Sequence, residues 1–410
     1  MRCEVRSGPQ RRFVVTAKDS PAGGKSMPRQ VDPSWRDGIH GVGAEDFKGL
    51  RALVGTVFWE GLAGKYPHMY SLENGENLRV VVENGRVVSH VGIIERNAAL
   101  FGCTVKVSSL GGVATYDTER GRGHATRLFE DAVRKCREDG VDYMLVSGYR
   151  KMYHRFGCRY VGKDWEFSLG PSDAERFDDE RVEVAEATQE DVEAIADLYR
   201  REPVRWLRPP SDYVHGMTGY VMNRPATWLL VRKDGALRGY VILSMSRREP
   251  ESRSASLAEF AGDREALAGA LGKIVRAHEL EQLGIHVLGN DAVMREQLEG
   301  RGLTARPANA SGTVMIINFR QLMERVRPHF EERLGTKAAE GFVFLEKGEK
   351  MVFALGCDQV VAEDRGQAVQ LIFGTLDGAE EPLLKAGDAA GEALRCVFPL
   401  PALWYGVNYV

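Results

Sequence analysis

The segment from Tyr116 to Gly140, YDTERGRGHATRLFEDAVRKCREDG, places two glycines and two arginines in a short turn directly before an amphipathic run. Upstream, the run KVSSLGGVATY contains β-branched residues and glycines and favours a strand. Downstream, apolar residues recur at the spacing of one helical face, and Gly140 stands where glycine commonly ends a helix. The segment therefore predicts a strand, a glycine turn and a helix in succession. The apolar positions of the helix are Ala125, Leu128, Phe129, Ala132, Val133 and Cys136.

This turn has the chemistry of an anion-binding site. The mouth of a helix presents unpaired backbone N–H groups and a partial positive charge. Gly121 and Gly123 allow the backbone to approach a phosphate closely, because no Cβ intervenes. Arg120 and Arg122 add positive charge that does not titrate away. We therefore expect the turn to hold a pyrophosphate.

Three other structures share some features of this turn. A P-loop is excluded because the chain contains no GxxxxGK[ST] motif. A dinucleotide-binding fingerprint is excluded because Thr126 stands at its third glycine position, and because the strand falls late in an antiparallel-rich unit. A plain solvated turn remains open from these residues alone.

The composition limits which classes of protein are possible. The chain has 410 residues, 43% of them hydrophobic and 28% charged, which favours a globular protein of two or three domains. Its formal net charge of −3 argues against nucleic acid or an anionic membrane as the main partner. No apolar run reaches the roughly 20 residues of a membrane span, and no secretory signal is recognisable. We therefore expect a cytoplasmic protein without a membrane span.

Six cysteines are spread along the chain without a CxxC pair or a Cys/His cluster at zinc spacing. Free thiols and no metal site are therefore expected, with Cys103 and Cys136 as small apolar packing residues. Residues 1–27 are basic and lack the apolar core of a signal, which predicts a flexible tail, or a translation start at Met27 in place of Met1.

The chain also contains an internal repeat. Residues 78–94 and 228–243 are each two β-rich runs, joined by Asn-Gly in the first case and by Asp-Gly in the second. A further strand, a turn, a helix and another strand follow each hairpin. Two copies of one mixed α/β unit are the simplest interpretation, with chance similarity of two hairpins as the alternative. The second turn, at 261–266, has one glycine and two carboxylates, which repel a pyrophosphate.

The rest of the chain predicts a third, α+β domain. A helical run at 319–335 leads to several strand-like runs. The chain ends in the apolar, aromatic sequence CVFPLPALWYGVNYV, which we expect to dock in a crevice. The strand-like runs are 341–356, 359–365 and 367–376. The expected division of the chain is a tail at 1–27 and domains at 28–180, 181–310 and 311–410.

Two elements of the first unit resemble the GNAT acetyltransferases. The turn matches their motif R-x-x-G-x-A, which holds the pyrophosphate of acetyl-coenzyme A, and Tyr153–Cys158 resembles their Y-x-K/R-x-G-F element. An active first unit, a silent second unit and an α+β domain with a docked terminus resemble the enhanced intracellular survival family. This resemblance implies an α/β (α+β) fold of tandem GNAT domains, each a mixed, mostly antiparallel sheet with flanking helices. It also implies a third domain similar to sterol carrier proteins, and a homohexamer.

The same resemblance implies an N-acetyltransferase that moves acetyl from acetyl-coenzyme A to a small-molecule amine. Tyr153 corresponds to the general acid, and the C-terminal carboxylate on Val410 corresponds to the base. By resemblance, one strand and a later stretch contact pantetheine, and the turn between them binds the pyrophosphate. The strand residues are Val113, Ala114 and Thr115, the turn residues are Arg120, Gly121, Arg122, Gly123, His124, Ala125 and Thr126, and the later residues are Gly148 and Tyr149.

The sequence leaves the acceptor amine open. Family members that acetylate aminoglycosides carry acidic residues in the acceptor pocket, whereas Tyr409 and Asn408 beside the C-terminus are uncharged. An aminoglycoside and a smaller or more apolar amine therefore both remain candidates, with Trp59 and Glu60 expected on the acceptor side. The alternative function is a lipid-binding or scaffolding protein with a vestigial acetyltransferase domain, against which the intact turn and Tyr153 argue.

Overall fold

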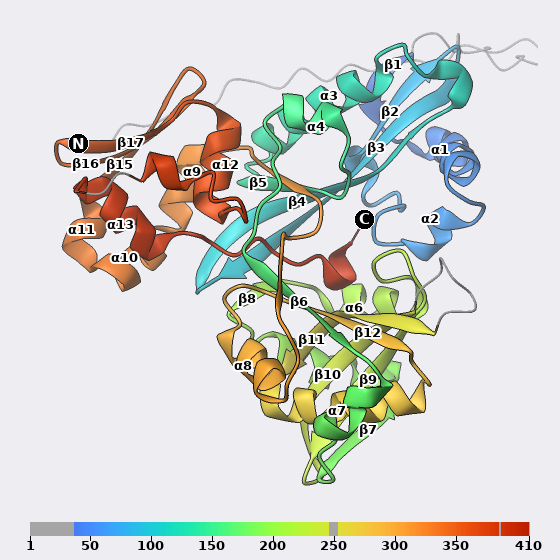
Figure 1. Ribbon diagram of the computed structural model, residues 1–410. Coiled ribbons are helices and arrows are strands. Elements are labelled where there is room, and N and C mark those ends of the chain that lie inside the picture. The colour runs from blue at the N-terminus through green and yellow to red at the C-terminus, as the bar shows by residue number, and fades with distance from the viewer. Residues whose placement is uncertain (1–36, 246–252, 385–386, 410) are drawn as a thin grey trace, which may run out of the picture.

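Figure 1 shows a computed structural model in which the chain forms three units. Residues 37–245, 253–384 and 387–409 are described. The predicted tail at 1–27, the alternative start Met27 and the C-terminal Val410 therefore lie outside the described residues. The first two units are each built on a seven-stranded sheet, and the third is built on a three-stranded sheet.

The first sheet confirms the first predicted hairpin. Its strands pair antiparallel except for β4 with β5, and the chain reverses between β2 and β3 at Asn84 and Gly85, which both have positive φ. A tight hairpin turn requires positive φ at both central residues, which an Asn-Gly pair tolerates. Across the sheet the order is β1 (Gly38–Gly41), β2 (Leu78–Glu83), β3 (Arg86–Leu100), β4 (Cys103–Thr115), β5 (Tyr143–Val146) and β14 (Thr313–Ile316), with β8 (Val204–Trp206) also paired to β3.

Helices cover both faces of this sheet. α3 (His124–Glu138) follows the glycine turn and packs on one face, while α1 (Ala44–Val57) packs on the other. Side chains alternate along β2, so Val81 joins the cluster under α3 and Val80 joins the cluster under α1. The apolar spacing predicted the buried face of α3, which consists of Leu128, Phe129, Ala132, Val133 and Cys136.

The second sheet repeats this plan. Its hairpin reverses at Asp234 and Gly235, again with positive φ at both, and the parallel pair β11 and β12 flanks the helix α7 (Arg264–Ala277). α7 and one face of the sheet enclose a separate hydrophobic cluster. The order is β13 (Arg306–Ala308), β6 (Asp164–Leu169), β12 (Gln282–Val287), β11 (Ser254–Gly262), β10 (Ala236–Met245), β9 (Ala226–Lys233) and β7 (Val182–Glu186).

Strand pairing crosses the domain boundaries expected at 180 and 310. β6 precedes residue 180 in the chain, yet it pairs with β12 in the second sheet. β14 follows residue 310, yet it pairs with β5 in the first sheet. Each sheet therefore contains a strand from beyond its own stretch of sequence, which ties the two units together through backbone hydrogen bonds.

The third unit places helices around a small antiparallel sheet. The run at 367–376 was predicted as a strand, and this prediction is wrong, because the run lies mostly in helix α12. Asp364 caps this helix by accepting from the Gln367 N–H, and an apolar run buried on all sides carries no periodicity that separates helix from strand. The elements are α9 (Phe319–Arg325), α10 (Arg327–Leu334), α11 (Thr336–Glu340), β15 (Phe342–Lys347), β16 (Lys350–Leu355), β17 (Asp358–Ala362), α12 (Arg365–Phe373) and α13 (Ala389–Val397).

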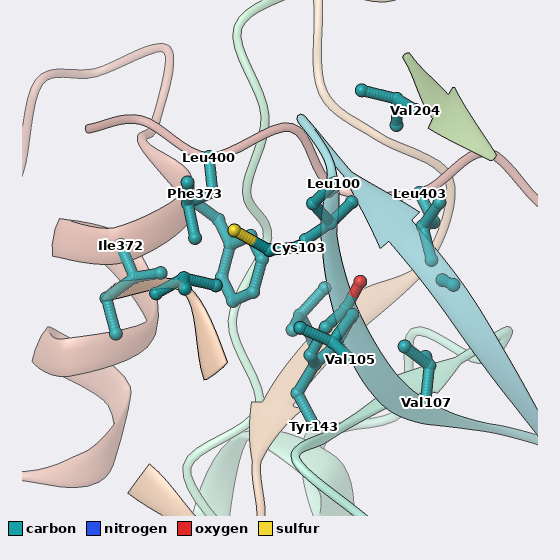
Figure 2. Packing of buried hydrophobic residues seen from close by; sticks show 14 of the residues in the cluster. Leu100, Cys103, Val105, Val107, Tyr143, Val204, Ile372, Phe373, Leu400 and Leu403 are labelled. Carbon is teal, nitrogen blue, oxygen red and sulfur yellow. The ribbon is translucent and has the colours of Figure 1, made fainter. Parts of the chain in front are cut away.

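The third unit packs against the first sheet. Figure 2 shows Phe373 of α12 close to Cys103 and Tyr143 of the first sheet, with Leu400 beside them. The rings of Tyr143 and Phe373 have their centroids 5.0 Å apart. Burial of these large apolar side chains fixes the third unit on the face of the first sheet away from α3.

The described cysteines are free thiols, and Cys103 and Cys136 are buried in apolar clusters as expected. Within the described ranges, no helix is long and apolar enough to cross a lipid bilayer.

A C-terminal segment, residues 398–409, leaves the third unit and ends in the short helix η7 (Gly406–Asn408) beside the second sheet (Figure 1). Most of its side chains are buried, as its apolar sequence predicts. The fully buried Arg208 donates to both carboxylate oxygens of Glu259, at 2.7 and 2.5 Å, and to Asn408 Oδ1 at 2.6 Å. This buried ion pair therefore connects the second unit to the end of the chain.

We predict that Glu259→Ala lowers the free energy of unfolding by about 3–5 kcal/mol, because it leaves the buried Arg208 charge without its partner. Urea denaturation followed by circular dichroism measures this change. The matched control is Glu138→Ala, which removes a partner of Arg134 from an exposed pair and should have little effect. Equal effects of the two substitutions would contradict the prediction.

Candidate active site

The glycine turn has the backbone conformation that its sequence suggests. Gly121 and Gly123 have φ of +79° and +78°, the left-handed region that favours glycine. Nothing lies within 4 Å of the position that a Cβ would take at either residue, so backbone conformation and not crowding selects glycine. Gly123 is the N-cap of α3 and no side chain of the described residues caps this helix, so its first N–H groups remain for a ligand.

A cavity of about 350 Å³ opens at this helix mouth. It combines residues of β4, the glycine turn, the start of α3 and the loop before α4 (Lys151–Arg155). Arg150, which the sequence analysis missed, adds a positive charge to the lining. The predicted cofactor residues that line this cavity are Val113, Thr115, Arg120, Gly121, Gly123, His124, Ala125 and Thr126.

The other predicted cofactor residues lie elsewhere. Ala114 is buried on the α1 side of the sheet, where its carbonyl accepts from the Ser89 hydroxyl at 3.0 Å. Arg122 does not line the cavity. Tyr149 is 58% exposed, and its hydroxyl accepts from the Gly312 N–H at 3.2 Å.

Salt bridges offset part of the charge that the sequence places in the turn. Arg122 bonds to Glu119 and lies 2.7 Å from Glu83, and these two carboxylates raise the pKa of its guanidinium. Glu83 belongs to β2, far from the turn in sequence, so a local count of charges misses it. Arg120 lies 2.8 Å from Asp117, but both side chains are exposed and solvent screens the pair.

His124 contributes its backbone to the turn more than its ring. Its ring is buried, and Nδ1 lies 2.8 Å from the guanidinium of Arg127. Burial lowers the pKa of this imidazole, which favours the neutral form. Ligand atoms of Glu83, Glu119 and His124 come within 4.8 Å of one another, but Arg122 already bonds to both carboxylates, so we assign no metal there.

A second cavity of about 400 Å³ adjoins the first and shares Val113 and Arg150 with it. Its wall is largely aromatic, and no aspartate or glutamate of the described residues lines it. Trp59 lines it as predicted, whereas Glu60 does not. The aromatic members of the wall are Phe58, Trp59, Tyr66, Tyr70, Tyr153 and Tyr409.

Tyr153 stands in the wall of this second cavity, close to predicted pantetheine residue Gly148. The side chain is 3% exposed and packs on Phe129, with ring centroids 5.3 Å apart. A Cβ added at Gly148 would lie 2.6 Å from the Tyr153 ring, so glycine is needed there for the ring to fit. Burial raises the pKa of the phenol, while the nearby Arg150 charge lowers it. The hydroxyl therefore stays protonated at neutral pH and can donate.

Residues of the second unit and of the C-terminal segment complete this cavity. Asn223, on the loop after α6 (Pro210–Thr218), donates to the Tyr409 hydroxyl at 2.9 Å and accepts from the Tyr66 hydroxyl at 2.6 Å. The sequence analysis missed Asn223, because no local signal places a loop of the second unit in the wall of the first. Val410 itself lies outside the described residues, but its neighbour Tyr409 lines the cavity.

Comparison with known proteins identifies the first unit. Residues 39–161 match the acetyltransferase (GNAT) domain family. Similar folds occur in GCN5-related N-acetyltransferases from Anabaena variabilis (13% identity, TM-score 0.64) and Kribbella flavida (15%, 0.61). Another similar fold is Eis1 from Mycobacterium abscessus (12% identity, TM-score 0.57). Each comparison covers 88% of this chain and 96% of the other. No curated protein sequence matches the chain.

The turn, the helix mouth and the joined cavities thus belong to a GNAT acetyltransferase domain, a class that transfers acyl groups from coenzyme A. This confirms the resemblance drawn from the turn and from the Tyr153 element. Beyond that domain, the similarity to Eis1 and to the two GCN5-related N-acetyltransferases is a similarity of fold.

We predict that Arg150→Ala weakens coenzyme A binding about tenfold, because it removes the one cavity-lining guanidinium that makes no salt bridge with a described residue. Isothermal titration calorimetry with coenzyme A measures the effect. Arg155→Ala is the matched control, because Arg155 is exposed at the end of α4, the helix that follows Arg150, and lines neither cavity. A similar loss in both variants would contradict a direct role for Arg150.

Proposed function

We propose that this protein is an N-acetyltransferase that transfers acetyl from acetyl-coenzyme A to a small, largely apolar amine. The observation that carries the proposal is the uncapped mouth of α3, whose cavity joins the cavity that contains Tyr153. The cavity at the mouth of α3 suits the diphosphate of the donor, and the cavity that contains Tyr153 suits the reacting groups.

On the donor side, backbone N–H groups of the glycine turn and the start of α3 bind the pyrophosphate, with charge from Arg120 and Arg150. Pantetheine then runs past Val113, where the two cavities meet, towards Gly148 in the second cavity. The parallel pairing of β4 with β5 ends at Leu110 and Val146, so the edge of β4 beyond it is open to bond the pantetheine amides.

In the chemical step, the neutral amine nitrogen attacks the acetyl carbonyl carbon, and the carbon–sulfur bond breaks. Tyr153 gives its phenolic proton to the departing thiolate. A thiol and a phenol have similar reference pKa values, so this transfer is not steeply uphill. The C-terminal carboxylate of Val410 takes the proton lost by the amine, which restores the proton balance once Tyr153 is reprotonated. The place of Tyr409 in the wall of the reaction cavity supports this assignment.

The acceptor cavity favours an aromatic or aliphatic monoamine over an aminoglycoside. An aminoglycoside carries several ammonium groups, which need carboxylates when they leave water. The described wall offers aromatic rings, which attract one ammonium and bury an apolar body. It also offers the Tyr70 hydroxyl, which is buried without a hydrogen-bond partner among the described residues and is free to bond to the substrate.

The second unit then corresponds to a degenerate GNAT domain without cofactor. Asp263 caps α7 by accepting from the Ala266 N–H at 2.8 Å, so the mouth of this helix is filled by the chain's own carboxylate. A carboxylate at this position also repels phosphate. The homohexamer, the cytoplasmic location and the likeness of the third unit to sterol carrier proteins stay predictions.

We predict acetyl-coenzyme A-dependent turnover with arylalkylamines and much less turnover with aminoglycosides. Release of free thiol, checked by mass spectrometry of the acetylated amine, measures it. Tyr153→Phe should lower kcat about 100-fold and leave coenzyme A affinity within twofold, because it removes the proton donor and keeps the ring. Turnover with none of the amines would contradict the proposed function, and unchanged kcat in Tyr153→Phe would remove its role as acid.

We predict that three residues added after Val410 lower kcat at least tenfold, because they move the terminal carboxylate away from the amine. The same three residues added before Met1 are the control and should have no effect. Steady-state kinetics with the best amine of the panel measures both. A fully active C-terminal extension would exclude the carboxylate as the base.

A further inference from the structure

The second sheet contains an opening that corresponds to the donor opening of the first. In the first sheet, the parallel ladder of β4 and β5 covers four residue pairs and ends at Leu110 and Val146. In the second sheet, the ladder of β11 and β12 also covers four pairs and ends at Leu257 and Ile285. Beyond this point β11 stays bonded to β10 and β12 stays bonded to β6, so the two strands separate. Separation leaves backbone groups that need other partners.

The side chain of Trp404 occupies this second opening. Its Nε1 donates to the carbonyl of Ala258, the first residue of β11 beyond the ladder, at 2.6 Å. Its ring stacks on His286, the first residue of β12 beyond the ladder, with centroids 4.0 Å apart and an interplanar angle of 17°. The indole therefore contacts both strands at the first position where they no longer pair with each other.

Two cavities meet at this indole. One, of about 70 Å³, extends towards Glu259 and Arg264, and the other, of about 300 Å³, extends towards Ser256 and Gln282. Trp404 and His286 line both cavities. Removal of the indole would join them into one passage between the separated strands.

We propose that the opening between β11 and β12 is a binding site for an indole ring, and that the chain uses its own Trp404 as the ligand. The second unit thereby acts as a receptor for the C-terminal segment, a role that needs no cofactor. The parallel with the donor opening rests on the function proposed above, whereas the contacts of Trp404 do not depend on it.

The residues that follow Trp404 make contacts that lead the end of the chain to the active site of the first unit. Glu259 accepts from the Val407 N–H at 3.3 Å, and Asn408 bonds to Arg208 at 2.6 Å and to Asp212 at 3.1 Å. Tyr409 follows and lines the acceptor cavity of the first unit. Trp404 is the first of these anchors along the segment, so loss of its indole should loosen the residues that reach the active site.

The test is Trp404→Gly, with indole supplied in solution. Calorimetry should show one indole bound per chain with a dissociation constant of about 0.1–1 mM, and no binding to the unmodified protein. Benzofuran, which has the same shape but no N–H donor, should bind at least about tenfold more weakly, because the Ala258 carbonyl then has no donor.

The second measurement is removal of C-terminal residues by carboxypeptidase Y, followed by mass spectrometry. We expect at least tenfold faster trimming in Trp404→Gly than in the unmodified protein, and a return towards the original rate at saturating indole. Trp165→Gly is the matched control. Trp165 lies on β6 of the same sheet, with its ring against Arg295. Its loss should change neither indole binding nor the rate of trimming.

A folded Trp404→Gly variant that binds no indole, or that is trimmed at the original rate, overturns the proposal. Should Trp404→Gly not fold, Trp404→Phe keeps a ring on His286 and loses only the donor. Trimming several-fold faster in that variant supports the proposal, and an unchanged rate overturns it. Neither measurement uses acetyl transfer, so failure of the proposed enzymatic function and failure of this site are distinguished.

Discussion

The separation of two parallel strands after four residue pairs is the constraint on which the rest of this molecule depends. A parallel pair needs a crossover helix, and here that helix follows the first strand of the pair, after the glycine turn in the first unit and after Asp263 in the second. The same step in the chain therefore produces an open strand edge and a helix mouth side by side. Both present backbone groups that need partners. The strand edge presents them in a row, and the helix mouth presents N–H groups at a point of partial positive charge. A diphosphate joined to a chain of amides satisfies both at once.

The two copies of this arrangement satisfy their backbone groups differently. In the first, the helix mouth is uncapped and glycines with positive φ hold the turn open, so the groups are left for a ligand. In the second, Asp263 caps the helix and the indole of Trp404 bonds to the open strand. Buried polar groups without partners are costly, so in the second copy residues of the chain itself fill these positions. In this view the carboxylate of Asp263 and the indole of Trp404 serve one purpose, because together they satisfy the backbone groups of the second copy.

The sequence predicted the features that rest on local signals. Helix α3 follows from the spacing of its apolar residues, and both hairpins follow from their Asn-Gly and Asp-Gly turns, because these residues tolerate positive φ. It could not predict that β6 and β14 pair across units, since strand partners are chosen by tertiary packing. For the same reason the sequence did not indicate that Glu83 of β2 pairs with Arg122 of the turn, or that Asn223 lies in the wall of the second cavity. Helix α12 was mistaken for a strand because burial on every side erases periodicity.

Buried charge beside the C-terminal segment has a role that apolar packing alone could not fill. Apolar side chains such as Leu400 and Leu403 supply attraction, but a chain held by them alone can slide without losing much burial. The pair of Arg208 with Glu259 is directional, and within the C-terminal segment it bonds to one side chain, Asn408, and one N–H, that of Val407. A shift by one residue would take Asn408 and the Val407 N–H away from this pair, and buried charged groups that lose hydrogen bonds cost more than a lost apolar contact. Charge therefore fixes the register of the segment, and a fixed register is what an active site needs from a residue delivered by the end of a chain.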